Sequence, residues 1–157
     1  TTDVYNLSFQ TERSLRIKIE VDTNPPMCFS TEQRLMVQPY SFMVQCMTLP
    51  CLFAGKMHAL VYRQWKNRVK GRDWYDFEWY VRWGHTLSWE HLHERIVEFS
   101  GKECTQNEFK ELLNHRLATT DINQVKADVL PFVHHPKELD IWSNDYFLQL
   151  AQRIRWE

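Results

Sequence analysis

The sequence has 157 residues and a formal net charge of −1 at pH 7. This length is enough for one or two small domains with an apolar core, and the balanced charge excludes a global basic field for nucleic acid. Hydrophobic residues make up 43% of the chain, with only 4 Gly and 6 Pro, which excludes long disordered stretches.

The cysteine and histidine spacings do not match a zinc site. Cys28, Cys46, Cys51 and Cys104 form no CxxC pair, and no histidine stands at zinc-ligand spacing from them. We expect free thiols, as in a reducing cytosol. The sequence shows no signal peptide and no apolar run of 18 residues, so we predict a soluble, cytoplasmic protein with no membrane partner.

The first fifty residues have the pattern of short β-strands. We expect strands over residues 3–9, 14–22, 35–37 and 41–47. In the second strand, the apolar Ile17, Ile19 and Val21 alternate with the charged Lys18, Glu20 and Asp22. The charged face either is exposed to solvent or holds a divalent metal through its two carboxylates.

Two helical patterns meet across a basic connector in residues 53–80. The first helix follows Pro50 and runs through Trp65, and its apolar stripe contains Leu52, Phe53, Met57, Leu60 and Val61, with Lys56 inside the stripe. The second has an apolar face of Trp74, Phe77, Tyr80 and Val81, with Asp73 within it and Asp76 on its edge. Charge on a core-facing stripe is costly unless it is paired, bound to a ligand or placed on a cavity wall.

These charges have a structural and a functional interpretation. In the structural one, Asp73 is the N-cap of its helix and Lys56 reaches solvent or pairs with an acid. In the functional one, Lys56, Arg72, Asp73 and Asp76 line a pocket that handles phosphate and metal. The basic run of Arg63, Lys66, Arg68, Lys70 and Arg72 is either a solvated face or a local RNA-binding patch.

The rest of the chain has the pattern of successive helices. Asp73 opens a helix that closes near Gly84, and further helices begin at Ser88, Thr105, Asp121 and Ser143. Thr105 and Glu108 have the spacing of a capping box. The helices end at Ser100-Gly101, near Ala118 and before Pro131, and residues 136–142 form a short helical turn.

The chain therefore divides near residue 50 into a β portion over 1–49 and a helical bundle over 50–157, which is an α+β fold. Three or four short strands without a covering helix make a poor independent sheet. We expect an open strand edge, which is completed by a missing N-terminal part, a partner chain or the bundle.

Several segments resemble the AbiEii/AbiGii-type nucleotidyltransferase toxin family. They are KIEVDTNPP at 18–26, LFAGKMHAL at 52–60, KGRDWYDFEWYV at 70–81, VKADVLPFV at 125–133 and ELDIWSNDYFLQLAQRI at 138–154. The resemblance implies a minimal nucleotidyltransferase fold, in which a small mixed sheet flanked by helices is followed by a helical C-terminal domain. It also implies an NTP-using, Mg²⁺-dependent transferase that acts on an acceptor such as tRNA, in a toxin–antitoxin or phage-defence system with an antitoxin protein as partner.

The resemblance assigns roles to particular residues. The family's strand motif falls on Lys18 and Asp22 with Glu20 between them, its helix lysine on Lys56, and its R-D-x-x-D on Arg72, Asp73 and Asp76. It implies catalytic Lys56, Asp73 and Asp76; phosphate-binding Lys18, Lys56 and Arg72; and metal-binding Asp22 or Glu20. Asp73 or Asp76 would orient Lys56 or act as a base on the acceptor hydroxyl. This interpretation predicts that Lys56 lies within about 5 Å of one of these aspartates.

One family motif is absent. Gly-Ser followed by Asp-x-Asp, which supplies the main metal ligands, does not occur in this sequence. We therefore expect the C-terminal portion of such a transferase or a truncated relative, without the full Mg²⁺ site. The alternatives are a non-catalytic interaction module of the same descent, which binds an antitoxin or nucleic acid, and an unrelated helical binding domain with structural charges only.

Overall fold

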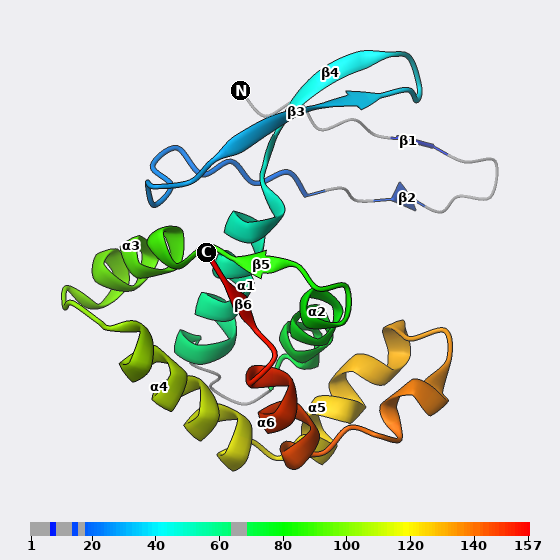
Figure 1. The fold of residues 1–157 in the computed structure, drawn as a ribbon. Helices are drawn as coiled ribbons and strands as arrows, with labels where there is room; N and C mark the ends of the chain where they lie inside the picture. The colour runs from blue at the N-terminus through cyan, green and yellow to red at the C-terminus, as the bar shows by residue number, and fades with distance from the viewer. Residues whose placement is uncertain (1–6, 9–13, 16–17, 64–68) are drawn as a thin grey trace.

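A β-hairpin lies above a bundle of helices in this computed structural model, which describes residues 7–8, 14–15, 18–63 and 69–157 (Figure 1). The hairpin is formed by β3 (Thr31–Met36) and β4 (Phe42–Met47), which pair antiparallel from Thr31 with Met47 to Met36 with Phe42. Two shorter strands, β1 (Leu7–Ser8) and β2 (Ser14–Leu15), pair antiparallel with each other.

The strand predicted over residues 14–22 is wrong for its second half. Residues 18–22 belong to no strand and are exposed, while residues 16–17 lie outside the described part. Alternation of apolar and charged residues predicts two faces, but a strand also needs a neighbour to accept its ladder of hydrogen bonds. The prediction at 41–47 is confirmed by β4, and β3 begins four residues before the predicted start at 35.

The hairpin has open edges, as expected. Among the described strands, β3 and β4 pair only with each other. Large apolar side chains remain exposed on this unit, including Leu35, Tyr40 and Met43.

In the described part of the chain, six α-helices follow the hairpin, mostly with the caps that the sequence predicts. They are α1 (Leu49–Tyr62), α2 (Gly71–Arg82), α3 (Trp89–Ser100), α4 (Gln106–Thr119), α5 (Ile122–Val129) and α6 (Asn144–Ala151), with the 3₁₀ turns η1 (Leu130–Phe132) and η2 (Pro136–Leu139). The side chains of Ser88, Thr105, Asp121 and Ser143 each accept a backbone N–H in the first turn of their helix. Thr105 and Glu108 form both halves of the capping box, and the helix they open ends at Thr119.

The core lies between α1 and the helices packed around it. Phe53 stacks on Tyr80 of α2 at a ring-centroid distance of 4.5 Å, and Met57 and Leu60 are fully buried beside it. Phe77 of α2 packs on Phe147 of α6. Burying rings of this size removes much apolar area from water and makes α1 the central helix of the bundle.

Two connections tie the segment before the hairpin and the C-terminus to the bundle. Met27, before the hairpin, accepts a hydrogen bond from Nδ1 of the buried His91 on α3 at 2.8 Å. At the other end, β6 (Arg155–Trp156) pairs in parallel with β5 (Thr86–Leu87), so the C-terminus lies beside the link between α2 and α3 (Figure 1). The pairing of β5 with β6 joins positions about seventy residues apart in the chain and is absent from the sequence-based prediction.

The architecture is α+β, as predicted, with small antiparallel and parallel two-stranded sheets beside a helical bundle. The boundary between residues 49 and 50 stays a prediction. Within the described ranges, no helix combines the length and apolar character needed to cross a membrane.

Candidate functional site

A cleft of about 500 Å³ lies where α1 meets the beginning of α2. Its charged lining consists of Lys56, Arg63, Lys70, Arg72, Asp73 and Asp76. Its apolar wall includes Val129, at the end of α5, and Phe132 in η1. The three residues of the R-D-x-x-D motif and the helix lysine therefore share one cavity.

Lys56 and Asp76 form an ion pair across the cleft. Lys56 Nζ donates to Asp76 Oδ2 at 2.6 Å, which confirms the predicted proximity. The side chains are 46% and 33% exposed, so water screens the pair and leaves both groups within reach of a ligand.

The prediction that Lys56 lies inside the apolar stripe of α1 is wrong. Lys56 and Leu52 are exposed, whereas Phe53 and Met57 are fully buried. Residues four apart share a helical face, so Leu52 and Lys56 form an outer face directly beside the buried one.

Arg63 and Asp73 form a second pair, deeper in the cleft. Arg63 Nη1 donates to both carboxylate oxygens of Asp73, at 2.9 and 3.2 Å. Asp73 is 5% exposed, and this burial raises its pKa, while the charges of Arg63 and Lys56 oppose the rise.

The prediction that Asp73 is the N-cap of its helix is also wrong. The helix α2 begins at Gly71 with Lys70 as its N-cap, so Asp73 is the third residue of the first turn. A carboxylate there still interacts favourably with the positive end of the helix dipole. Asp73 therefore pairs with Arg63 from the first turn of α2 and does not cap the helix.

Arg63 is a site residue that the sequence analysis placed only in a basic run. It is the C-cap residue of α1, seven residues or about two helical turns after Lys56, and both cations line the same cleft. Asp73 and Asp76 are three residues apart on α2, and Asp73 pairs with Arg63 while Asp76 pairs with Lys56. The seven-residue spacing was the signal that would have identified Arg63. Lys66 and Arg68 of the same run lie outside the described residues.

The far wall of the cleft is held by a close contact between α2 and α5. Gly71 N donates to Asp128 Oδ2 at 2.9 Å. A Cβ at Gly71 would lie 2.2 Å from the carbonyl oxygen of Val125, so only glycine fits there. This contact brings Phe132 near the start of α2, where the guanidinium of Arg72 lies 5.4 Å from its ring centroid.

The first motif segment does not join this cleft. Lys18 forms an ion pair with Glu20, and Asp22 Oδ1 accepts the backbone N–H of Asn24 at 3.1 Å. All three predicted residues are exposed, and none of them lines the cavity. The structure therefore does not bring Lys18, Glu20 and Asp22 into one site with Lys56.

The residues present do not fit a Mg²⁺ site by themselves. In the part of the chain that the structure describes, no three His, Cys, Asp or Glu side chains come together as metal ligands. Asp73 and Asp76, the two carboxylates of the cleft, each face a cation instead of an open position. Mg²⁺ needs several oxygen ligands in octahedral geometry, and two paired carboxylates do not supply them.

A protein-family model described as nucleotidyl transferase AbiEii toxin, type IV TA system, matches residues 2–150. The match spans nearly the whole chain. The chain belongs to the AbiEii family. It is a nucleotidyltransferase-like toxin of a type IV toxin–antitoxin system, and the family implies an antitoxin as its partner. Comparisons with curated proteins and with solved structures give no match.

Proposed function

We propose that this AbiEii chain binds the triphosphate of a nucleoside triphosphate in the α1–α2 cleft and acts in nucleotidyl transfer to an acceptor such as tRNA. One observation carries the proposal. Lys56 of α1 and Arg63, the residue that follows α1, each face a carboxylate of α2 over the same cavity. With Lys70 and Arg72, four cations oppose two carboxylates, which leaves the lining net positive and suited to phosphate.

The contacts suggest a role for each charged residue. Lys56 and Arg72 are exposed enough to bind phosphate oxygens, Lys56 as a point charge and Arg72 as a planar fork. Asp76 orients Lys56, and Asp73 holds Arg63 at the floor of the cleft. Of the two carboxylates, Asp76 is more accessible to an acceptor hydroxyl, so we assign proton acceptance to it.

Magnesium enters this proposal through carboxylates that the 157 residues do not contain. The metal would supply charge neutralisation on the transferred phosphate. The family's Asp-x-Asp would hold it, in a longer form of the chain or in an assembly that carries this motif. We further propose that the toxin acts in the cytoplasm and in phage defence.

The test is a transfer assay on the full-length gene product with NTPs labelled at the α-phosphate, Mg²⁺ and bulk tRNA. Lys56→Ala and Asp76→Asn are compared with Lys102→Ala, a control at an exposed site next to the end of α3. The proposal expects label on tRNA that Lys56→Ala abolishes and Lys102→Ala retains. Failure of the wild-type protein to transfer any of the four nucleotides would contradict it.

The second candidate is a non-catalytic interaction module of the same descent. The observation in its favour is that the described residues bring together no set of metal ligands. Under this alternative, the protein binds antitoxin or nucleic acid through the cleft and transfers no label.

A further inference from the structure

Three residues of α2 and its C-cap residue, Trp83, form one stripe that runs outward from the cleft. Arg72, Asp76, Trp79 and Trp83 follow the spacing i, i+4, i+7 and i+11, which places them along one side of the helix. Trp79 is 40% exposed and Trp83 is 65% exposed. The first half of the stripe belongs to the charged cleft and the second half is aromatic.

The two tryptophans are not needed for the core of the bundle. The buried side of α2 already contributes Trp74, Phe77 and Tyr80, which are 7% exposed or less. An indole left in water gains nothing from the hydrophobic effect, and adjacent exposed aromatic side chains often mark a binding surface. Trp79 and Trp83, four residues apart, lie on successive turns of one side of the helix.

Trp79 is held in place before any ligand binds. Its ring packs edge-on against Tyr80 at 5.0 Å and tilts over His85 at 5.1 Å. Tyr80 in turn stacks on the buried Phe53. An aromatic side chain fixed by its neighbours loses little conformational entropy when a flat ligand stacks on its free side.

The charges at the other end of the stripe identify the ligand class. Asp76 pairs with Lys56, and Arg72 lies one turn before Asp76, so both residues of the stripe at this end line the net positive cleft. Trp79 follows Asp76 by three residues on the same side of α2, so the indoles continue the stripe beyond the residues that line the cavity. Phosphate groups complement the cations, and nucleobases complement indole faces by stacking. A single-stranded nucleic acid combines both features, because its bases are not already paired.

We propose that Trp79 and Trp83 form a base-stacking surface that extends the phosphate-binding cleft along α2. The inference rests on the proposed function, because it uses the cleft as the phosphate end of the same site. Arg72 and Lys56 bind the backbone of the strand, and the two indoles stack on neighbouring bases.

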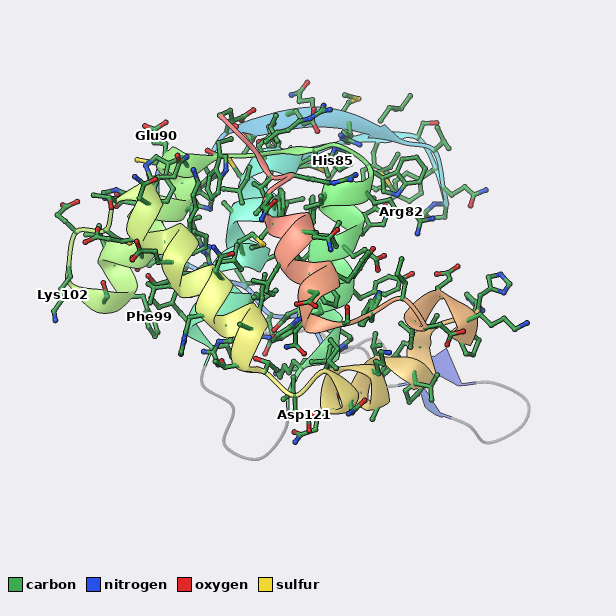
Figure 2. All side chains as sticks on the ribbon, turned by 60° about the horizontal axis from the view of Figure 1, so that its bottom comes forward. Arg82, His85, Glu90, Phe99, Lys102 and Asp121 are labelled. Atoms are coloured by element: carbon green, nitrogen blue, oxygen red, sulfur yellow. The ribbon has the colours of Figure 1, made fainter. Side chains whose placement is uncertain are left out.

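The test compares ring loss with ring retention at these two positions. The probe is a fluorescein-labelled 12-residue oligo(U), titrated with the full-length protein at low salt and followed by anisotropy. Trp79→Leu and Trp83→Leu keep an apolar side chain but remove the ring, whereas Trp79→Phe and Trp83→Phe keep a ring. Phe99→Leu is the control, since Phe99 is 60% exposed on α3 and lies well away from Arg82 and His85 at the end of α2 (Figure 2).

We expect each leucine variant to bind roughly 5- to 150-fold more weakly, which corresponds to the loss of one base stacked on an aromatic ring. The phenylalanine variants should stay within a few-fold of the wild type, and Phe99→Leu should be unchanged. Circular dichroism checks that each variant is folded. Wild-type binding of oligo(U) by the leucine variants would overturn the proposal. Phenylalanine variants as weak as the leucine ones would also overturn it, because stacking on a base requires an aromatic ring and tolerates phenylalanine.

A parallel titration with inorganic triphosphate separates this inference from the proposed function. If triphosphate binding requires Lys56 while the leucine variants bind oligo(U) normally, the stacking surface fails and the phosphate site stands. If triphosphate does not bind but oligo(U) binding depends on the two rings, the stacking surface stands and the nucleotide site fails.

Discussion

Lys56 Nζ lies 2.6 Å from Asp76 Oδ2 and joins α1 to α2 at the cleft. The pair is half-exposed, so its contribution to folding is small, but it fixes a cation beside an open cavity. The Arg63–Asp73 pair, three residues earlier on α2, is the more buried of the two. The two pairs should therefore differ in what their loss does to stability.

Replacing Lys56 should affect ligand binding much more than folding. We expect Lys56→Ala to lower the free energy of unfolding by less than about 1 kcal/mol, because exposed ion pairs contribute little. Urea denaturation measures this change. A loss of several kcal/mol would make Lys56 a structural residue, as the alternative of purely structural charges requires.

Replacing Arg63 should cost more than replacing Lys56. Arg63→Ala leaves the buried Asp73 carboxylate without its nearest cation, so we expect a loss of about 1–3 kcal/mol in the free energy of unfolding. The double variant Arg63→Ala with Asp73→Asn should recover part of this loss, because the uncompensated charge is gone. A double variant with the summed loss of the two single variants would show that the two side chains do not interact.

The close contact between α2 and α5 gives a matched pair of glycine variants. Gly71→Ala places a Cβ 2.2 Å from the backbone oxygen of Val125, so α5 must move and we expect a loss of about 1–3 kcal/mol. Gly55→Ala meets no atom closer than 3.9 Å, and alanine favours helix, so we expect a gain of up to about 1 kcal/mol. Thermal unfolding of both variants checks the prediction, and equal melting temperatures would contradict it.

His58 should make the protein less stable in mild acid. Burial, with a smaller contribution from the charge of Arg95, lowers the pKa of His58 from 6.5 to about 4. Between pH 4 and pH 6.5 the unfolded chain therefore binds more protons at His58 than the folded chain does. The contribution of the neutral His58 to the free energy of unfolding is complete above pH 6.5 and is lost as the pH falls toward 4. We expect His58→Phe, which retains a ring beside Tyr62 and Phe99, to flatten the dependence of stability on pH over this window.

The control for this effect is His134→Gln, which changes an exposed histidine. Unfolding free energies of the wild type and both variants are compared from pH 4 to pH 7. An unchanged slope in His58→Phe would contradict the assignment, and a slope flattened equally by His134→Gln would show that burial is not the cause.

Local features of this fold were predictable from sequence. Helix caps such as Ser88 and Thr105 depend on residues within one turn, and both form as predicted. The motif predicts that Lys56 lies close to Asp73 or Asp76, and the structure places it on Asp76. These predictions hold because each rests on a short spacing or on a pattern specific to a family.

Features that depend on distant contacts were missed. The parallel pairing of β5 with β6 joins two-residue strands, whose sequence carries no signal of its own. The strand predicted over residues 14–22 has the right alternation, but among the described residues no strand pairs with its second half, 18–22. Arg63 is one of five basic residues between positions 63 and 72, so composition alone assigns it to that run. Its seven-residue spacing from Lys56 is the signal that relates it to the cleft.

The most direct test of the central claim is an isothermal titration of the full-length protein with inorganic triphosphate. The wild type is compared with Lys56→Ala and with Lys102→Ala, whose site is next to the end of α3. The account predicts that triphosphate binds the wild type and Lys102→Ala alike and binds Lys56→Ala at least about tenfold more weakly, since a charge-assisted phosphate contact contributes roughly 1.5–3 kcal/mol. Equal affinity of Lys56→Ala and the wild type would show that the α1–α2 cleft does not bind phosphate.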